Sequence, residues 1–429
     1  MTAPLRIAIA GLGTVGGSTA HILKARAAEL GERAGRPLAL VMVSARDRRK
    51  PRAADLSDVP WTDDPLALAR GDADVVVELI GGEDGIARRL AETALAAGKH
   101  VVTANKALLA NHGAHLAQLA EKHGAVLRFE AAVAGGIPIV RSLREGLIAF
   151  GVEAVRGILN GTCNYILTQM EATGRSFAEV LAEAQNMGYA EADPSLDIEG
   201  GDTAHKLAIL SSLAFGTEPS LAGMPVQGIS HITPEDIGFA REFGCRIKLL
   251  GVARRAGEGV DQRVHPAMVR LGTPLADVEG AFNAVVADAG EAGPYFFEGR
   301  GAGAAPTASA VVADLVDIAR GGRGPAFGRP AILLKPANAA PAAARLCAYY
   351  LRFDVLDVPG VLAEIARHLA DWDVSIESMI QRGRSPGEPV AIVMITHECP
   401  EAKLARALKT IAASDKVLSA PCMIPMESG

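Results

Sequence analysis

A short apolar segment followed at once by a glycine-rich turn constrains this chain more than any other feature of its sequence. Residues 5–10 read Leu-Arg-Ile-Ala-Ile-Ala, and residues 11–16 read Gly-Leu-Gly-Thr-Val-Gly. A strand, then G-x-G-x-x-G, then a helix is typical of a dinucleotide-binding unit, in which the glycines permit a tight turn and close approach of a pyrophosphate. The helix N-terminus offers free N–H groups to the phosphates. The residues assigned to cofactor binding are therefore Gly11, Leu12, Gly13, Thr14, Val15 and Gly16.

Four further segments have the composition of buried strands and alternate with helical stretches. They are residues 38–43, 75–80, 100–103 and 126–129. Strands that alternate with helices predict a doubly wound parallel sheet. We therefore expect a Rossmann-type domain over residues 1–135, with ligands bound outside the carboxyl ends of its strands.

The segment after the second strand bears on the choice between NAD and NADP. It reads Ser-Ala-Arg-Asp-Arg-Arg-Lys over residues 44–50. An acidic residue at this place binds the ribose 2′-hydroxyl, whereas an arginine accommodates a 2′-phosphate. Arg46 lies close to the right place and three more cations follow it, which favours NADP, although Asp47 keeps NAD open. The alternative is that the four cations only form a solvated loop.

Lys106 lies where another strand ends, in the sequence Ala-Asn-Lys-Ala over residues 104–107. It also stands at the expected start of a helix, where the helix dipole disfavours a cation. An anionic ligand explains a lysine there, so we predict that Lys106 contacts both cofactor and substrate. The alternative is an ordinary lysine at a helix start.

The densest group of ionisable side chains lies in residues 188–212. Gly200 and Gly201 break the chain there, so Asp202 can act as the N-cap of a new helix. Asp202 and Lys206 are four residues apart and lie on one helical face. The alternative is a solvated acidic loop with a surface ion pair, worth only about 0.2–1 kcal/mol. The carboxylates ahead of the lysine are Glu191, Asp193, Asp197, Glu199 and Asp202, and the apolar residues expected to bury the helix are Leu207, Ile209 and Leu210.

Turns rich in small residues surround that stretch. Residues 129–139 form a hinge that leaves the first domain, and residues 160–165 open a helix at about Tyr165. Residues 299–309 precede a helix over 311–319 and can close over the cofactor, so we assign Gly303 to cofactor binding. Taken by itself, this last segment is better interpreted as merely a flexible loop. Strand-like segments mixed with helices predict an α+β substrate domain over residues 136–320.

Composition excludes several classes of protein. The net charge of −6 and the aromatic content of 4% give no footprint for nucleic acid. No apolar run is long enough to span a membrane. The five cysteines are odd in number and never form a Cys-x-x-Cys pair, which suits a reducing cytoplasm rather than a disulfide frame or a thiolate zinc site. We therefore expect a cytoplasmic protein without nucleic-acid or membrane partners.

Together these motifs resemble those of homoserine dehydrogenases that carry a C-terminal ACT domain. The similarity extends over essentially all 429 residues. Residues 160–165 (Asn-Gly-Thr-Cys-Asn-Tyr) and the 188–206 stretch are its most specific parts, whereas the glycine turn alone is not specific. The other matching motifs are residues 11–16, Ala-Asn-Lys-Ala (104–107), Glu-Ala-Ala-Val-Ala-Gly-Gly-Ile-Pro (130–138) and Gly-Ala-Gly-Ala-Ala-Pro-Thr-Ala-Ser (301–309).

The resemblance implies NAD(P)-dependent interconversion of L-homoserine and L-aspartate 4-semialdehyde, a step in the biosynthesis of threonine, methionine and isoleucine. In the family, the lysine matching Lys206 is the acid–base residue, and the lysine matching Lys106 lies between cofactor and substrate. The acid matching Glu191 binds the substrate amino group, and the aspartates matching Asp197 and Asp202 orient substrate and lysine.

The resemblance also implies a monovalent cation, typically sodium. Its ligands in the family match the carboxylate of Glu130 and the backbone oxygens of Val133, Gly135 and Ile137.

The C-terminal part follows a stretch crowded with Gly, Pro and Ala, which we interpret as a linker over residues 321–344. The order strand, helix, strand, strand, helix over residues 345–429 resembles a ferredoxin-like ACT domain, and Asp-Val-Pro-Gly-Val-Leu (357–362) resembles its usual loop. The resemblance implies a small amino-acid effector, threonine, in a homodimer or homotetramer. The alternative is a dimerisation module without a ligand. The residues implied in effector binding are Asp357, Pro359, Gly360 and Val361.

Two other functions compete with this reading. One is a different amino-acid oxidoreductase with the same cofactor domain. The other is a nucleotide-binding sensor that catalyses nothing. The grouping of Glu191 with Lys206 favours an enzyme, because a sensor needs no acid–base lysine.

Overall fold

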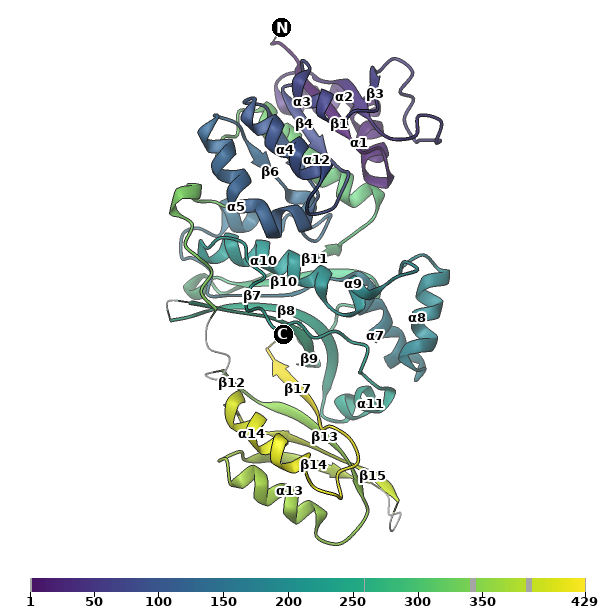
Figure 1. Cartoon of the computed structure of the whole chain (residues 1–429), viewed down its shortest axis with the longest axis vertical. Coiled ribbons are helices and arrows are strands. Elements are labelled where there is room, and N and C mark those ends of the chain that lie inside the picture. The colour runs from purple at the N-terminus through teal and green to yellow at the C-terminus, as the bar shows by residue number, and fades with distance from the viewer. Residues whose placement is uncertain (1, 258, 340–344, 383–387, 429) are drawn as a thin grey trace.

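Three bodies follow one another along the long axis of the molecule (Figure 1). The computed structural model describes residues 2–257, 259–339, 345–382 and 388–428. The last five residues of the predicted linker, 340–344, lie outside the described residues. Among the described residues, no helix has both the length and the apolar character needed to cross a membrane.

The N-terminal body is a six-stranded sheet with all strands parallel, in the order β3-β2-β1-β4-β5-β6. This is the doubly wound architecture predicted from the sequence. The inward-facing Ile7, Ile9, Val75 and Val77 are fully buried. The strands are β1 (Leu5–Ala10), β2 (Leu38–Ser44), β3 (Trp61–Thr62), β4 (Val75–Glu78), β5 (His100–Thr103) and β6 (Leu127–Arg128), and the helices are α1 (Thr14–Ala25), α2 (Ala27–Ala34), α3 (Leu66–Arg70), α4 (Ile86–Ala96) and α5 (Lys106–Lys122).

A helix from much later in the chain completes this body. Helix α12 (Ala304–Ala319) packs against α1, and its Val311 and Leu315 lie in the same buried cluster as Ile7 and Ile9 (Figure 1). On sequence alone these residues group with the 136–320 segment, whereas in the structure α12 packs against the N-terminal body. The sequence pattern of a hydrophobic helix is the same whichever sheet the helix covers. The local pattern therefore could not predict which sheet α12 packs against.

The middle body contains the strands that carry the candidate site, and they continue without a break into the C-terminal body. The nine-stranded sheet has the order β11-β10-β7-β8-β9-β17-β13-β15-β14. Its strands are β7 (Ala154–Ile158), β8 (Cys245–Ala256), β9 (Gly259–Arg270), β10 (Phe282–Asp288), β11 (Pro294–Arg300), β13 (Tyr349–Leu356), β14 (Ile376–Gln381), β15 (Pro389–Thr396) and β17 (Cys422–Glu427). The short pair β12 (Leu346–Cys347) and β16 (Cys399–Pro400) stands apart.

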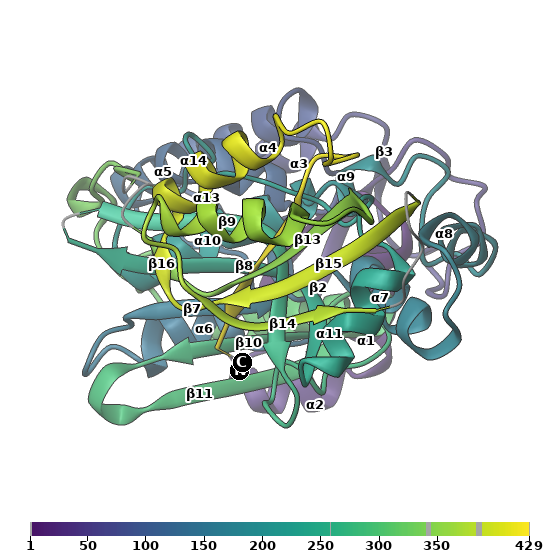
Figure 2. The ribbon, with the colours of Figure 1, turned by 90° about the horizontal axis from the view of Figure 1, so that it is seen from below.

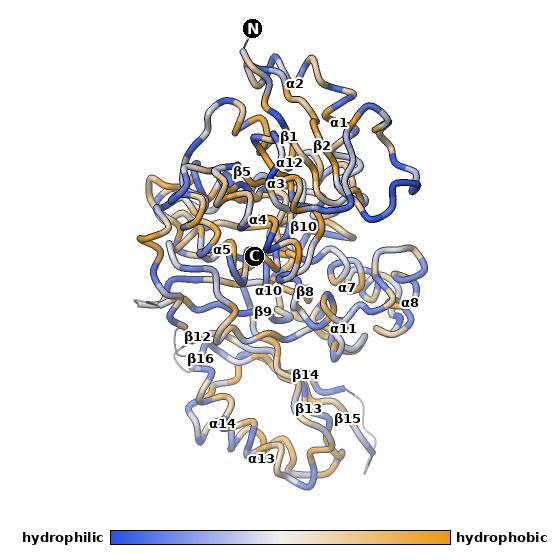
Figure 3. The backbone as a smooth tube through the Cα atoms, turned by 45° about the horizontal axis from the view of Figure 1, so that its top comes forward, coloured by the Kyte–Doolittle hydropathy of each residue, from blue (hydrophilic) through white to orange (hydrophobic). Residues whose placement is uncertain are grey.

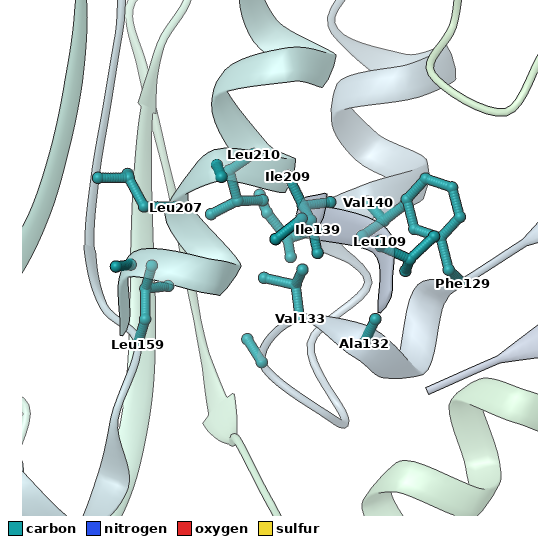
Figure 4. Close-up of a cluster of buried hydrophobic side chains, with 14 of the residues drawn as sticks. Leu109, Phe129, Ala132, Val133, Ile139, Val140, Leu159, Leu207, Ile209 and Leu210 are labelled. Atoms are coloured by element: carbon teal, nitrogen blue, oxygen red, sulfur yellow. The ribbon is translucent and has the colours of Figure 1, made fainter. Parts of the chain in front are cut away.

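Helix α10 (Gly201–Phe215) is the central support of the middle body. It packs against α5 on one side and against β8 and β9 on the other. As predicted, Leu207, Ile209 and Leu210 are fully buried, and Figure 4 shows them beside Leu159 and the 129–140 turn. The other helices of this region are η1 (Glu130–Ala132), α6 (Ile139–Arg141), η2 (Ser142–Gly146), α7 (Gly161–Thr173), α8 (Phe177–Asn186), α9 (Ser195–Ile198), α11 (Pro234–Glu242), η3 (Gly290–Ala292) and η4 (Ala331–Leu333).

The start of α10 differs from the prediction. Gly200, with φ of 87°, takes the N-cap position, and Asp202 lies inside the first turn. A left-handed residue there needs a glycine. The carboxylate of Asp202 is consequently released from capping and accepts hydrogen bonds from other side chains.

The C-terminal body has two amphipathic helices, α13 (Val361–Ala370) and α14 (Glu401–Ile411), whose mixed colouring is visible in Figure 3. Figure 2 shows them covering one face of the β13–β15 strands. The predicted order of strand, helix, strand, strand and helix is confirmed by β13, α13, β14, β15 and α14. Strand β17 was not predicted. It pairs antiparallel with β13 and parallel with β9, at Met426 opposite Met268 and Glu427 opposite Val269.

Candidate active site

Lys206 lies on α10 with its ammonium held in place by two acceptors. Its Nζ donates to the backbone oxygen of Leu159 at 2.6 Å and to Asp202 Oδ2 at 2.7 Å. Leu159 directly follows β7, so the end of a strand and the first turn of a helix fix the amine from two sides. An ammonium has three protons, and these contacts use two of them.

Lys106 approaches the same carboxylate from the other body. It is the first residue of α5, whose N-cap is Asn105, and its Nζ lies 3.1 Å from Asp202 Oδ1. The Lys206 side chain is 12% exposed and the Asp202 side chain 6%, whereas that of Lys106 is 34% exposed. The structure thus joins three residues that the sequence predicted to act together, and it places them where the Rossmann body meets the middle body.

Asn160 belongs to this group and was not singled out from the sequence. Its Nδ2 donates to Asp197 Oδ1 and to Asp202 Oδ2, both at 2.8 Å, while its Oδ1 caps α7 by accepting from the N–H of Cys163. One amide therefore holds two carboxylates together. The signal in the sequence was the helix-capping motif 160–165, but its partners lie 37 and 42 residues away.

The charges of the two lysines determine the ionisation of this group. Burial alone would raise the pKa of Asp202, but the nearby ammonium groups of Lys206 and Lys106 outweigh it and hold that pKa well below its ordinary value. Burial, and then the charge of Asp202, raises the pKa of Asp197. Burial also raises the pKa of the Cys163 thiol, which donates to the Asp197 backbone oxygen at 3.2 Å. At neutral pH Asp202 is a carboxylate between two amines.

Glu191 lies in the exposed loop between α8 and α9. Thr162 Oγ1 donates to the Tyr189 backbone oxygen at 2.9 Å, and Gln185 Nε2 donates to the Glu191 backbone oxygen at 3.1 Å. These bonds tie the loop to the start of α7 and leave the Glu191 carboxylate facing solvent.

The glycine turn has the shape that a pyrophosphate requires. Gly11 adopts φ of 93°, and a Cβ on Gly16 would lie 1.9 Å from the Gly11 backbone oxygen, so both positions exclude a side chain. Nothing obstructs Gly13 within 4 Å. The first turn of α1 has no side-chain cap and no acidic residue, so its N–H groups are available to an anion. Gly303, with φ of 115°, is the N-cap of α12.

Arg46 is exposed in the loop that follows β2. The shape of this loop is set by Arg52, which donates to the backbone oxygens of Asp47, Arg48 and Lys50 and lies 4.9 Å from the ring centre of Trp61. Arg52 therefore turns inward and leaves Arg46 at the surface.

A second network that the sequence did not reveal lies at the ends of β4 and β5. Glu78 is fully buried, and its carboxylate accepts from the N–H groups of Ile80 and Gly81 and from Thr103 Oγ1. Asn105 Nδ2 donates to the Gly82 backbone oxygen at 2.6 Å. These bonds fix the first turn of α5 and hence the start of the Lys106 side chain.

The predicted cation ligands surround a tight buried turn. Ala134 and Gly135 adopt consecutive left-handed conformations, with φ of 52° and 47°. Glu130 is 5% exposed, and its carboxylate accepts the N–H groups of Val140 and Arg141. Burial, and then the charge of Asp314, raises the pKa of Glu130 to about 7.

Backbone oxygens are the remaining candidates for that cation. Among the described residues, no hydrogen bond reaches the oxygens of the buried Val133 and Gly135, whereas Ile137 accepts the N–H of Ile139 at 2.8 Å. Within the described ranges, no group of three or more His, Cys, Asp or Glu side chains is arranged so that it could hold a metal ion. The donors present are therefore hard oxygens, which suit an alkali cation rather than a transition metal.

The residues predicted to bind an effector form the turn between β13 and α13. Pro359 and Gly360 are exposed, Asp357 is half-buried and Val361 is buried. Gly360, with φ of 95°, is the N-cap of α13. This turn lies in the third body, remote along the long axis from α10, the helix that carries Lys206 (Figure 1).

Three family models match the chain in the order of the three bodies. They are the homoserine dehydrogenase NAD-binding domain over residues 11–130, homoserine dehydrogenase over 138–316, and the ACT domain over 349–415. The chain belongs to the homoserine dehydrogenase family. It is therefore an oxidoreductase with a nicotinamide-binding domain and a C-terminal ACT domain, as the motifs implied.

Individual relatives agree over the full length. The homoserine dehydrogenase of Neisseria gonorrhoeae is 45% identical over 432 residues, covering 99% of both chains. The crystal structure of a homoserine dehydrogenase from Thiobacillus denitrificans superposes with a TM-score of 0.93 at 45% identity, covering 99% of both chains. A hyperthermophilic archaeal homoserine dehydrogenase in complex with NADPH covers 73% of this chain and 97% of its own, with a TM-score of 0.63 and 26% identity.

Proposed function

We propose that this homoserine dehydrogenase interconverts L-homoserine and L-aspartate 4-semialdehyde with Lys206 as the acid–base residue. The observation that carries the proposal is the ammonium of Lys206, held by Leu159 O and Asp202 at 2.6 and 2.7 Å, with one proton left over. The test is NAD(P)H formation from L-homoserine, followed by absorbance with each cofactor in turn. Absence of turnover with both cofactors would refute the proposal.

The residues divide the work of the reaction between them. The bound nicotinamide supplies or accepts the hydride. In reduction, Lys206 donates its remaining proton to the oxygen that develops negative charge, and in oxidation the neutral amine takes that proton back. Asp202 accepts a hydrogen bond from this ammonium and keeps it aligned. Because Asp202 and Leu159 O are both buried, the lysine reaches the substrate already oriented.

Substrate binding falls to the two groups that face outward. Lys106 is one-third exposed and carries the charge to bind the substrate carboxylate or the developing alkoxide. The exposed carboxylate of Glu191 is suited to the substrate ammonium. Asp197, held through Asn160, orients the substrate beside them.

NADP is the cofactor that we propose, with NAD as the alternative. The support is the exposed Arg46 after β2, where an arginine accommodates a 2′-phosphate. The archaeal relative was solved with NADPH, which agrees with this choice. Gly11, Gly13 and Gly16, the N-terminus of α1 and Gly303 would hold the rest of the cofactor.

Reversing the charge at Arg46 is expected to discriminate between the cofactors. Arg46→Glu should raise KM for NADP by roughly 10–100-fold, the loss of a hydrogen bond to a charged group, and leave KM for NAD nearly unchanged. The matched control is Arg49→Glu in the same exposed loop. Equal effects of the two changes on KM for NADP would indicate a merely solvated basic loop.

We further propose a sodium ion held by the Glu130 carboxylate and the oxygens of Val133, Gly135 and Ile137. Support comes from the two buried oxygens, which accept no hydrogen bond from any residue that the structure describes, and from the consecutive left-handed residues that turn them. The turn packs on the loop before α12, because a Cβ on Gly135 would lie 2.5 Å from the Gly301 oxygen. The ion would brace the hinge between the bodies and take no part in the reaction.

Replacing sodium by choline at constant ionic strength is expected to lower stability and activity. A ligand that binds only the folded state stabilises by about 2.7 kcal/mol when its concentration is 100 times Kd. The measurement is the melting temperature across a sodium titration. Glu130→Ala should abolish the response, and a response that survives in this variant would place the ion elsewhere.

Threonine is the effector that we propose for the ACT domain, bound near Asp357, Pro359, Gly360 and Val361 in a homodimer or homotetramer. Exposed Glu377, Met379 and Gln381 on the edge strand β14 support pairing with a second copy.

Threonine is expected to inhibit the intact enzyme, and Asp357→Ala should weaken that inhibition by about tenfold or more without changing uninhibited turnover. The physical reason is loss of a carboxylate that can bind the effector ammonium. Initial rates across a threonine titration provide the measurement. Unchanged inhibition in the variant would remove Asp357 from the site, and no inhibition of the wild type would leave the domain as an assembly module.

A further inference from the structure

Asn283 donates a hydrogen bond to the backbone oxygen of Leu159, which is also an acceptor for Lys206. Asn283 lies on β10, is 1% exposed, and donates from Nδ2 to the Leu159 oxygen at 3.0 Å. The same oxygen accepts the Lys206 ammonium at 2.6 Å. A carbonyl oxygen has two lone pairs, so these two donors fill it.

The orientation of the Asn283 amide follows from its surroundings. With Nδ2 toward Leu159, the contact is donor to acceptor, and Oδ1 is left buried without a partner among the described residues. A rotated amide would put two oxygens against each other. The Asn283 side chain makes a second contact, with Gly301, and this contact is steric rather than polar.

That steric contact is with the loop proposed to close over the cofactor. A Cβ on Gly301 would lie 2.1 Å from Asn283 Cγ and 2.1 Å from its Nδ2, so only a glycine fits against the amide. Gly301 stands two residues before Gly303, and its own oxygen packs on Gly135. The Asn283 side chain is thus clamped between the cofactor loop and the Leu159 peptide.

We infer that Asn283 is a positioning residue for the reaction, which fixes the Leu159 carbonyl toward Lys206 and links that alignment to the seating of the 301–303 loop. The inference rests on the proposed role of Lys206. Without the amide, the Leu159 peptide is free to turn, and the ammonium keeps only Asp202 as a firm acceptor. With the loop displaced, the amide moves and the same alignment is lost.

The test combines five single variants, one of them a control, and one double variant in the full-length enzyme. Asn283→Ala should lower kcat by about 3- to 10-fold, as expected for one lost hydrogen bond, with little change in KM for homoserine. Asn283→Asp should lower kcat and also move the pH profile of homoserine oxidation to higher pH, because a carboxylate beside the shared oxygen favours the ammonium. If Asn283 had a purely structural role, the pH profile of homoserine oxidation would not shift in this variant. Asn338→Ala, an exposed asparagine remote from the site, is the matched control.

Gly301→Ala supplies an independent arm in case the Asn283 variants do not fold. Its methyl group must push the amide off the Leu159 oxygen, so it should lower kcat in the wild type but cost little more in the Asn283→Ala background. Additive losses, or an unmoved pH profile in Asn283→Asp, would overturn the inference. Lys206→Ala separates the two hypotheses: full activity there refutes the proposed acid–base role, whereas an inactive Lys206→Ala beside unaffected Asn283 and Gly301 variants refutes only this inference.

Discussion

Lys206→Ala is expected to lower kcat by about 10²–10⁴-fold in both directions, the usual contribution of a positioned acid–base group. KM for the cofactor should stay nearly constant, because the glycine turn that we propose to bind the cofactor lies in the other body. The measurement is steady-state turnover of homoserine with saturating cofactor, together with cofactor binding by fluorescence to show that the variant is folded.

Lys206→Arg is the control for charge. A guanidinium keeps the positive charge beside Asp202 but does not lose a proton in proteins, so homoserine oxidation should remain lost. Recovery of oxidation in the arginine variant would show that charge alone suffices and would remove the proton-transfer role.

Asp202→Asn is the second change with a large expected effect. The amide replaces a carboxylate that both lysines contact, at 2.7 and 3.1 Å, and leaves two ammonium groups facing each other. Removing one partner of a buried ion pair costs about 3–5 kcal/mol, and we expect the lower end because Lys106 is one-third exposed. We expect kcat to fall by roughly 100-fold, since the ammonium is no longer aligned.

Denaturant unfolding and steady-state kinetics measure the two parts of that effect. Asp193→Asn is the matched control. Asp193 belongs to the same acidic stretch but is exposed, and among the described residues its side chain accepts hydrogen bonds from Ser195 alone. If the two variants behave alike, the acidic stretch is a solvated loop and the carboxylate of Asp202 has no special role.

Much of this architecture was predictable because its signals are local. The strand and glycine turn at residues 5–16 stand in one continuous segment, and the spacing of Asp202 and Lys206 follows directly from the helical repeat. The apolar residues after Lys206 correctly predicted a buried helix. The error at its start was of the same local kind: Asp202 has the residue type of a cap, but the left-handed Gly200 already fills that position.

The features that escaped the sequence depend on contacts between distant segments. Asn160 was recognisable as a helix cap, which it is. Nothing near it in the sequence indicates that its amide also bridges two carboxylates, one from α9 and one from α10. Strand β17 resembles any short terminal segment until β9 and β13 are placed on either side of it. Asn283 becomes meaningful only when Leu159 and Gly301 lie against it.

The late position of α12 in the sequence determines the order in which the two bodies can finish folding during synthesis. Residues 1–135 leave the ribosome about 180 residues before α12 is complete, an interval of roughly 10–40 s at usual elongation rates. Throughout that interval the nascent N-terminal sheet lacks α12, the helix whose Val311 and Leu315 pack against it. An apolar face of the sheet therefore stays exposed to water and to other chains. The dinucleotide-binding body therefore matures only after most of the middle body has been made. An isolated 1–135 fragment should aggregate, and one joined to residues 304–320 should stay monomeric.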